Sequence, residues 1–467
     1  MSQVLASYAV EFDNEDQSNA VRHVIDQSEP HSLRTFTPSQ AVLAKSAGVF
    51  HWTPEGRRLY DFASGVLVAN LGHNPVGWTR RFHQYLGWTP AQLAAADDTF
   101  FEAVSLTAYN AITELEAEAS RRLLANLQSH PGGSRLDTVI WAASGSEGVQ
   151  KALWACMRRD PSRPGIMATR HGFHGKKGLS GAVTGSETDK ERDPRVRFIS
   201  FPRHECSDMD HPEKAFDPAV YRAELEDVLA NAEHPIGCLI TEPYLGGGGS
   251  YHPPKEYLQL LQDFCREHDI LFILDEVQAN FGRTGCMYAF ETYGLEPDFV
   301  CLGKGLGNGV PVSAAVGRRD VCELMGYGDT SDTWSANPMS CAAVLATLDE
   351  FENSNILEHA QHLSKVLTDG LRKLKDTGVI VNLRGEGTVF GIECGAVGAA
   401  SPNKVANAVI ERSYLGNDDN DGIHLLGPLA NCVIRIAPPM CMTEQQAQHS
   451  LQLLYGFVED VGNRLRG

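Results

Sequence analysis

The chain has 467 residues, and its 59 acidic side chains outnumber 40 basic ones, which leaves a formal net charge of −19 at pH 7. This negative surplus opposes binding to nucleic acid or anionic lipid, because phosphate groups attract lysine and arginine. With 42% apolar and 21% charged residues, the composition is that of a globular protein and excludes the disordered and fibrous classes. A chain of this length favours two or three domains.

Eleven cysteines lie between Cys156 and Cys441, without a C-x-x-C pair and without a cysteine and histidine cluster at zinc spacing. This pattern is typical of reduced thiols in a cytosolic enzyme rather than of disulfides or a metal site. Residues 1–20 lack the basic start and apolar stretch of a secretory signal, and no apolar run approaches the roughly 20 residues of a membrane helix. We therefore expect a soluble, cytoplasmic protein with no metal and no membrane partner.

The N-terminal segment, residues 1–75, begins with a helical pattern and contains a predicted hairpin around Thr53–Arg57. In the following part, 76–340, short apolar runs alternate with helical patterns such as Glu147–Arg159 and Pro254–His268. The apolar runs predict seven strands, at Thr138–Ala142, Gly165–Thr169, Val196–Phe201, Cys238–Thr241, Leu271–Leu274, Phe299–Leu302 and Ser313–Val316. This alternation predicts an α/β domain with a mainly parallel sheet, and the apolar strands indicate that both sheet faces are covered.

The C-terminal part, 341–467, has a different pattern. Two long helical patterns precede two strand runs and a closing helix, at Ser340–Glu352, Ile356–Leu374, Val389–Glu393, Cys432–Ile436 and from Thr443. They predict a smaller α+β domain. We expect segment 1–75 to join this smaller domain, while 76–340 forms the large one.

A run of small residues, Ala-Ser-Gly-Ser-Glu-Gly at 143–148, follows the first predicted strand of the large domain and opens a helix. Backbone N–H groups and hydroxyls at a helix N-terminus favour a bound phosphate. Taken alone, however, the run is explained more simply as an N-cap made by Ser144 or Ser146.

Two charged residues stand at the ends of predicted strands. Asp275 ends a strongly apolar strand, and a buried carboxylate needs a cation, a metal or a polar ligand, although a structural salt bridge explains an isolated acid equally well. Lys304 is framed by glycines in LGKGLGNG, directly after the strand Phe299–Leu302. It is either a solvated surface charge or a Schiff-base amine beside a bulky cofactor.

The segment HGFHGK, 171–176, follows another predicted strand. Its two histidines have no third ligand of matching type nearby, which argues against a metal site. Phe173 is explained as a core residue unless a flat cofactor lies against it. Other motifs fail on spacing: the glycines at 303, 305 and 307 do not fit G-x-G-x-x-G, no P-loop is present, and Ser146 is not in a G-x-S-x-G elbow.

The order of these four segments resembles the class III aminotransferases, which are pyridoxal-phosphate (PLP) enzymes of the aspartate-aminotransferase fold. The resemblance covers most of the chain, and its motifs are DFASGVLVANLGHNP from Asp61, LDEVQANFGRTG at 274–285, LGKGLGNGVPVSA at 302–314, RGEG at 384–387 and RIAPP at 435–439. It implies a large, mainly parallel sheet domain plus a smaller α+β domain that covers the substrate.

The resemblance also implies roles for the cofactor residues. Lys304 matches the lysine that forms the internal aldimine with PLP and then shuttles a proton at the substrate Cα. Asp275 matches the acid paired with the pyridine nitrogen, which makes the ring an electron sink. The other implied contacts are Gln278 near the phenolic oxygen, Val277 and Phe173 on the two ring faces, Gly145 and Ser146 at the phosphate, and Thr333 at the phosphate of the neighbouring subunit. A contribution from Thr333 implies a homodimer or a tetramer with shared sites.

Three positions bear on the substrate. Glu242 and Arg435 match a pair in which the arginine binds an α-carboxylate and the glutamate masks the arginine when an ω-amine enters; a fixed salt bridge is the simpler alternative. Lys176 stands where family members acting on 4-aminobutyrate, ornithine or acetylornithine usually carry an arginine that binds the substrate carboxylate. Lysine lacks the guanidinium fork, so the resemblance does not name the donor.

The implied activity is transfer of an amino group from an ω-amine or ω-amino acid to 2-oxoglutarate. The donor classes implied are 4-aminobutyrate, ornithine, acetylornithine and diamines. The alternative is a PLP-dependent aminomutase or amino-acid racemase of the same fold, which needs no oxo-acid substrate. A decarboxylase and a non-catalytic binding subunit rank behind these. Arg435 beside Glu242 favours transamination, because it suits an oxo-acid acceptor.

Overall fold

Seven strands form the largest sheet, in the order β4-β10-β9-β8-β7-β5-β6. Their bounds are β4 Thr138–Ala142, β5 Gly165–Thr169, β6 Val196–Ile199, β7 Ile236–Thr241, β8 Leu271–Asp275, β9 Phe299–Leu302 and β10 Ser313–Gly317. All seven predicted strands are therefore present, and the mainly parallel sheet is confirmed. Only β10 runs antiparallel to its neighbours, β4 and β9, so the carboxyl ends of the other six strands share one edge.

The computed structural model describes residues 8–96, 99–185, 193–206, 208–210 and 215–467. Residues 1–7 of the predicted N-terminal segment lie outside this description. Within the described residues, no helix combines the length and the apolar character needed to cross a bilayer.

Helices cover both faces of the large sheet, as the apolar strands predict. Along β8, Leu271 and Ile273 pack into one buried cluster with residues of α6, while Phe272 and Leu274 pack into a second with residues of α5, α9 and α12. Successive side chains of a strand point to opposite faces, so a strand between two helical layers is apolar throughout. The helices of this part are α3 Val76–Leu86, α4 Pro90–Ala94, α5 Glu114–Ser129, α6 Gly145–Arg159, α7 Gly178–Ala182, α8 Pro218–Asn231, α9 Lys255–Glu267, α10 Ala289–Tyr293, α11 Arg319–Cys322 and α12 Pro338–Asn353.

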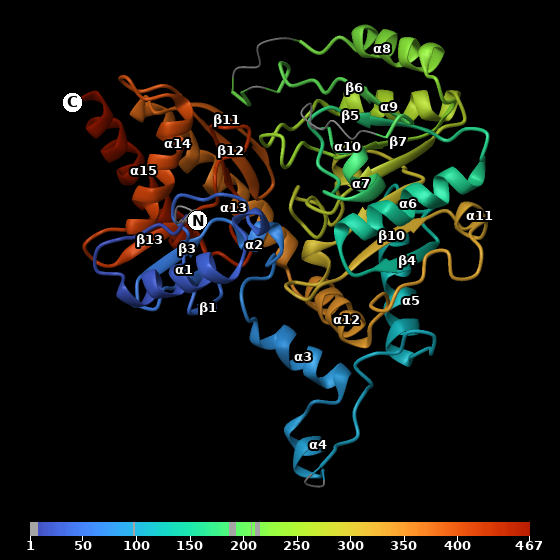
Figure 1. Cartoon of the computed structure of the whole chain (residues 1–467), viewed down its shortest axis with the longest axis horizontal. Coiled ribbons are helices and arrows are strands. Elements are labelled where there is room, and N and C mark those ends of the chain that lie inside the picture. Colours follow the sequence, from blue (N-terminus) through green and yellow to red (C-terminus); the bar gives the residue numbers. More distant parts are fainter. Residues whose placement is uncertain (1–7, 97–98, 186–192, 207, 211–214) are drawn as a thin grey trace, which may run out of the picture.

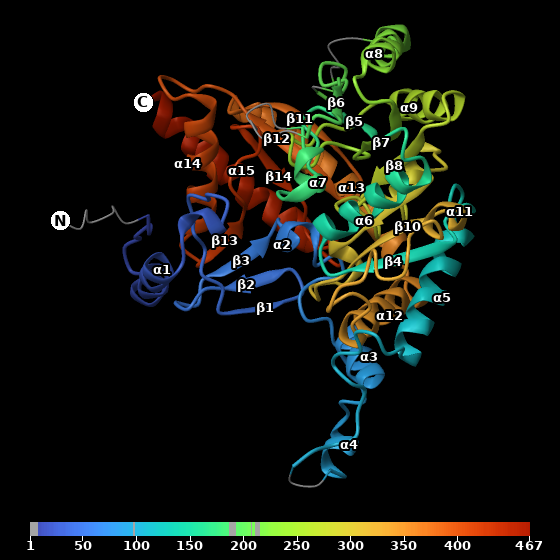
Figure 2. The same ribbon diagram turned by 45° about the vertical axis from the view of Figure 1, so that its right-hand side comes forward.

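The N-terminal strands lie beside the C-terminal elements, as Figures 1 and 2 show in blue and red. β3 pairs in parallel with β13, although the two strands are far apart in the chain. One sheet has the order β1-β2-β3-β13, and another has the order β11-β12-β14. The bounds are β1 Lys45–Ala47, β2 Phe50–Trp52, β3 Arg58–Asp61, β11 Ile380–Glu386, β12 Val389–Cys394, β13 Asp421–His424, β14 Val433–Ile436, α1 Asp16–Ser28, α2 Ser64–Leu67, α13 Ile356–Arg372, α14 Pro402–Leu415 and α15 Glu444–Arg466.

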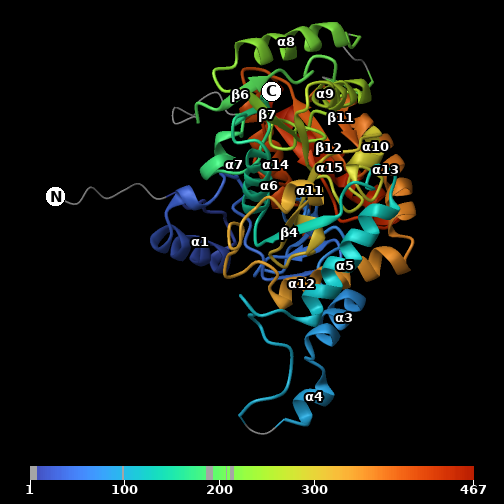
Figure 3. The ribbon, with the colours of Figure 1, turned by 90° about the vertical axis from the view of Figure 1, so that its right-hand side faces the viewer.

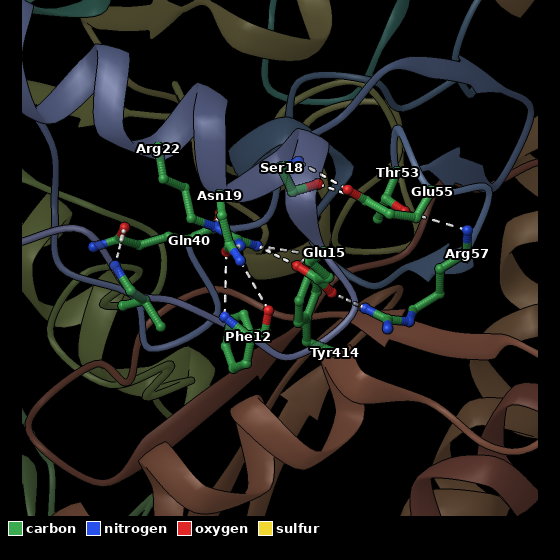
Figure 4. Close-up of polar contacts among 11 residues, drawn as sticks. Phe12, Glu15, Ser18, Asn19, Arg22, Gln40, Thr53, Glu55, Arg57 and Tyr414 are labelled. Carbon is green, nitrogen blue, oxygen red and sulfur yellow. Dashed lines mark hydrogen bonds and ion pairs between the residues drawn. The ribbon is translucent and has the colours of Figure 1, made fainter.

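A buried charge cluster attaches α1 to the C-terminal elements (Figure 4). Glu15, which is fully buried, accepts a hydrogen bond from Arg22 at 2.8 Å and another from the hydroxyl of Tyr414 on α14 at 2.9 Å. Arg57, at the predicted hairpin between β2 and β3, forms an ion pair with the other carboxylate oxygen. Three separate segments of the chain therefore meet at one carboxylate.

Helix α4 projects from the body of the molecule in all three ribbon views (Figures 1, 2 and 3), whereas α3 packs against α12. The chain returns from this projection with exposed apolar side chains, among them Leu106, Tyr109 and Ile112, the last of which is 85% exposed. The amide of Asn337, just before α12, donates a 2.6 Å hydrogen bond to the backbone carbonyl of Leu106. The returning chain thus lies against the loop that precedes α12.

Candidate active site

The candidate site lies at the carboxyl edge of the large sheet. Asp275 is the last residue of β8, and Lys304 comes two residues after β9. Glu242 follows β7 directly, and the segment 171–176 comes after β5. In open α/β sheets, ligands bind beside the carboxyl ends of the strands, so the topology itself gathers these chemically active residues.

Lys304 is partly buried, and its backbone takes a conformation that lysine rarely adopts. Its φ is +48°, in the left-handed region, and the extended Gly303 precedes it. Burial and the nearby positive charge of Arg435 together lower the pKa of Lys304 to about 8, against the opposing effects of Asp275 and Glu242. The side chain is therefore not a solvated surface charge, and it is more easily deprotonated than an ordinary lysine.

Asp275 is held by two hydrogen bonds from its own chain. One carboxylate oxygen lies 2.7 Å from Nδ1 of His174, and the other accepts a 3.0 Å hydrogen bond from the backbone N–H of Val277. His174 is itself buried. This histidine was considered in the sequence only as a metal ligand, and its contact with Asp275 was missed. Its position after β5 was the available signal, because that strand end meets the end of β8 at the same sheet edge.

The N-terminus of α6 lies beside these residues. Ser144 is its N-cap, and Glu147 completes a capping box with it, so the capping explanation is correct for Ser144. A β-carbon built on Gly145 would come 3.0 Å from the side chain of Val277, and one on Gly175 would come 2.5 Å from the hydroxyl of Ser146. The backbone at Gly145 and Gly175 therefore lies too close to its neighbours for an ordinary side chain. Such close backbone packing at a helix N-terminus suits a bound phosphate.

Arg435 and Glu242 form no ion pair within the described residues. Nη1 of Arg435, on β14, donates a 3.3 Å hydrogen bond to the side-chain oxygen of Gln278, and its buried Nε has no hydrogen-bond partner there. Glu242 instead accepts backbone N–H hydrogen bonds from Phe173 at 2.8 Å and Gly246 at 3.2 Å. Burial lowers the pKa of Arg435. The fixed salt bridge considered for this pair is absent.

The other predicted site residues are more exposed. Phe173 is 40% exposed, which contradicts its explanation as a core residue, and its ring is available to a flat ligand. Lys176 and Thr333 are both exposed, the latter on the loop that precedes α12. The structure therefore brings Lys304, Asp275 and Gln278 together but places Thr333 at the surface of the chain.

Three groups meet at one edge of the sheet: the partly buried amine of Lys304, the carboxylate of Asp275 at the end of β8, and the N-terminus of α6. This combination is that of PLP-dependent enzymes of the aspartate-aminotransferase fold. The residues fit the cofactor: the amine suits its aldehyde, the carboxylate its pyridine nitrogen, and the α6 N-terminus its phosphate.

Comparisons with known proteins define the family. The family model described as aminotransferase class-III matches residues 34–457. The chain therefore belongs to the class III aminotransferases, and it is a PLP-dependent aminotransferase. It is 31% identical to an acetylornithine aminotransferase of Methanopyrus kandleri, over 80% of this chain and 85% of the relative. It is 27% identical to a 4-aminobutyrate aminotransferase of Mycobacterium leprae, over 90% of this chain and 91% of the relative.

Solved structures agree on the fold. The ornithine aminotransferase of Toxoplasma gondii superposes with a TM-score of 0.79 at 20% identity, and the match covers 97% of each chain. A transaminase from the marine bacterium Virgibacillus superposes with the same TM-score of 0.79 at 19% identity, over 96% of this chain and all of that one. The predicted architecture, with a large sheet and smaller additional sheets, is confirmed.

Proposed function

We propose that the protein transfers an amino group from an ω-amine or ω-amino acid to 2-oxoglutarate. The observation that carries this proposal is Arg435, a buried guanidinium at the site that forms no ion pair with a carboxylate of the described residues. A buried cation without a counter-ion is costly, and a substrate carboxylate would relieve that cost bidentately. An aminomutase or racemase needs no such oxo-acid site.

Four residues of the chain would perform the chemistry. The cofactor, when bound, supplies an electron sink for the bond cleavage at the substrate carbon. Lys304 would hold the cofactor and then move the proton at the substrate Cα, a task for which its lowered pKa of about 8 is suited. Asp275, oriented by His174, would keep the pyridine nitrogen protonated. Gln278 would lie at the phenolic oxygen.

The remaining assignments follow the same resemblance. Val277 and Phe173 would enclose the ring, and Gly145 and Ser146 would hold the phosphate. Lys176 would face the distal end of the donor, where its exposed ammonium offers one point charge rather than a fork. This supports a donor whose distal group requires no bidentate binding, within the class of 4-aminobutyrate, ornithine, acetylornithine or diamine substrates.

We propose a homodimer in which Thr333 completes the phosphate site of the neighbouring subunit. Its exposure supports this, as does that of Trp334, which is 62% exposed beside it. The apolar residues Leu106, Tyr109 and Ile112 of the projecting chain add uncovered surface near the same loop. We also propose that 1–75 and 341–467 together form the smaller domain around the large domain 76–340, apart from α12, which packs on the large sheet. We further propose that the protein is cytoplasmic.

The direct test is a half-reaction without any oxo acid. Purified holoenzyme is mixed separately with 4-aminobutyrate, ornithine, lysine, putrescine, β-alanine and glutamate while the visible absorbance of its cofactor is recorded. Glutamate and one ω-amine are expected to abolish the visible band, and the ω-amine that does so identifies the donor. An unchanged band with glutamate would contradict the role of Arg435 and favour isomerase chemistry.

A lysine variant provides the control. Lys304→Ala is expected to lose the visible band and to lower turnover by at least about 10³-fold, because the general acid and base is removed. Lys177→Ala, which changes an exposed neighbouring lysine, is expected to retain both.

A further inference from the structure

A second polar cluster is buried in the β1-β2-β3-β13 sheet, apart from the candidate active site. It consists of His51 on β2, Asp61 at the end of β3 and His424 at the end of β13. Each of the three offers one ligand atom, and these atoms all lie within 4.8 Å of one another. His51 and Asp61 are buried, with exposed fractions of 3% and 0%.

Strand register brings the three residues to the same place. His424 lies directly opposite Asp61 in the parallel pairing of β13 with β3. His51 lies opposite Leu59 in the antiparallel pairing of β2 with β3, and Leu59 is two residues before Asp61. Side chains two residues apart on a strand share a face, so all three point to the same side of the sheet (Figure 2 shows the strands).

Surrounding hydrogen bonds orient the ligand atoms toward one another. Nδ1 of His51 is bonded to the hydroxyl of Ser46 at 2.6 Å, so its Nε2 faces the carboxylate of Asp61 at 3.4 Å. One oxygen of Asp61 accepts backbone N–H hydrogen bonds from Ala63 and Ser64, at 2.7 and 3.0 Å. The other oxygen is left for the histidines. Such supporting contacts are typical of metal sites, where outer partners fix the tautomer and orientation of each ligand.

The buried Nδ1 of His424 has no hydrogen-bond partner among the described residues. An unsatisfied buried nitrogen costs free energy, and a cation would relieve that cost.

We propose that His51, Asp61 and His424 bind a divalent transition-metal ion, with zinc as the best match. Two imidazole nitrogens and one carboxylate oxygen are a common zinc ligand set, and the fourth position is left to water. His73, whose Nε2 lies 2.7 Å from Asp61 Oδ2, would support the carboxylate from outside. Ligand atoms around tetrahedral zinc are about 3.3 Å apart. The His51–Asp61 separation of 3.4 Å already meets this value.

This ion would join segments that the chain keeps far apart. It would connect β2 and β3 of the N-terminal segment to β13 of the C-terminal part, in the sheet where these strands already pair. The sequence predicts no metal site because it has no cysteine and histidine cluster at zinc spacing. The three ligands stand at positions 51, 61 and 424, so only the folded chain brings them together.

The test measures zinc binding to chelator-treated holoenzyme by competition with a chromophoric chelator, together with the metal content after gel filtration. Wild-type protein is expected to retain one zinc ion per chain. His51→Phe/His424→Leu is expected to bind zinc at least about 100-fold more weakly. His362→Leu, which changes a half-exposed histidine of α13, is the matched control and is expected to bind as wild type does. Equal affinity of the double variant and wild type, or no retained zinc in wild type, would overturn the proposal.

A second measurement does not depend on how the variants fold. Cobalt(II) is added to metal-free wild-type holoenzyme, and difference spectra are recorded against the untreated holoenzyme. Visible d–d bands without a thiolate charge-transfer band are expected, because the ligands are nitrogen and oxygen. A thiolate band would show that cysteines bind the metal instead, and that outcome would also overturn the proposal.

Discussion

At the residue scale, the fold holds the carboxylate of Asp275 in a fixed orientation. Its two oxygens contact His174 and the backbone N–H of Val277, so the side chain cannot rotate freely. A buried carboxylate that is fixed in this way can hold a proton-bearing nitrogen opposite it without reorganising. His174 is therefore a positioning residue, which acts through Asp275.

Replacement of His174 tests that role. His174→Phe is expected to lower kcat by about 10- to 100-fold, the range for a partner that orients a catalytic group, and to shift the pH dependence of the cofactor spectrum. His174→Asn is expected to restore much of both properties, because its amide N–H can occupy the position of Nδ1. A phenylalanine variant with the wild-type kcat and spectrum would contradict the assignment.

Ionisation of Glu242 is expected to make the KM for 2-oxoglutarate depend on pH. Burial raises its pKa to about 7, so the side chain is neutral below that pH and a carboxylate above it. The charged form lies close enough to Arg435 to interact with it, and it would compete with a substrate carboxylate. The KM for 2-oxoglutarate is therefore expected to rise about 3- to 10-fold between about pH 6 and about pH 8.

Steady-state kinetics of Glu242→Gln across the same pH range provide the measurement. The variant is expected to show a nearly constant KM, because its amide does not ionise. Glu233→Gln, at a surface glutamate with 72% side-chain exposure, is expected to keep the wild-type rise. A rise that persists in Glu242→Gln would assign the titration to another group.

At the scale of elements, the attachment of α1 depends on very few side chains. Its apolar face is weak, since its two buried residues are Ser18 and Arg22. The ion pair of Arg22 with the fully buried Glu15 supplies the missing contact, and Ser18 adds hydrogen bonds to Glu55 at 2.6 and 2.8 Å. Polar contacts of this kind specify where an element docks more than they add stability.

Loss of the Glu15 carboxylate should therefore lower the free energy of unfolding. Glu15→Gln leaves two arginines without their counter-ion, and it is expected to lower the free energy of unfolding by about 3–5 kcal/mol. Urea denaturation followed by circular dichroism measures the change. Glu11→Gln, which removes an exposed pair with His23, is expected to cost less than about 1 kcal/mol. An equal loss of unfolding free energy in the two variants would show that the buried Glu15 cluster stabilises the chain no more than an exposed ion pair does.

At the scale of the whole molecule, the proposed homodimer would complete each phosphate site with Thr333 of the neighbouring subunit. Thr333 is exposed on the loop before α12, and the projection carrying α4 extends away from the body (Figure 3). Exposed apolar residues on a projection are typical of a surface that another chain covers. The proposed homodimer would account for both features.

Subunit mixing tests the shared site. Lys304→Ala and Thr333→Glu proteins are each expected to be inactive, the second because a carboxylate would repel the cofactor phosphate. Random mixing of their subunits is expected to restore about a quarter of wild-type activity, since half of the dimers regain one of two sites. No activity above that of the separate variants would contradict the contribution of Thr333 across the interface.

The sequence alone determined the large sheet and most of the chemistry at its edge. Buried strands require apolar runs, so the strand ending at Asp275 and the strand preceding Lys304 are visible as local patterns. Residues just after such strands share one edge, which places these two side chains together without any knowledge of long-range contacts. Burial of Lys304 then removed the alternative of a surface charge, which spacing could not do.

Only the tertiary structure decided the contacts between distant segments. The hydrogen bond of His174 to Asp275 and the register of His424 opposite Asp61 join residues from different strands, and no repeat of two or 3.6 residues encodes them. The same holds for Arg435, whose partner is Gln278 rather than Glu242. Local periodicity reports which face of an element is buried, whereas the pairing of faces depends on packing of the whole chain.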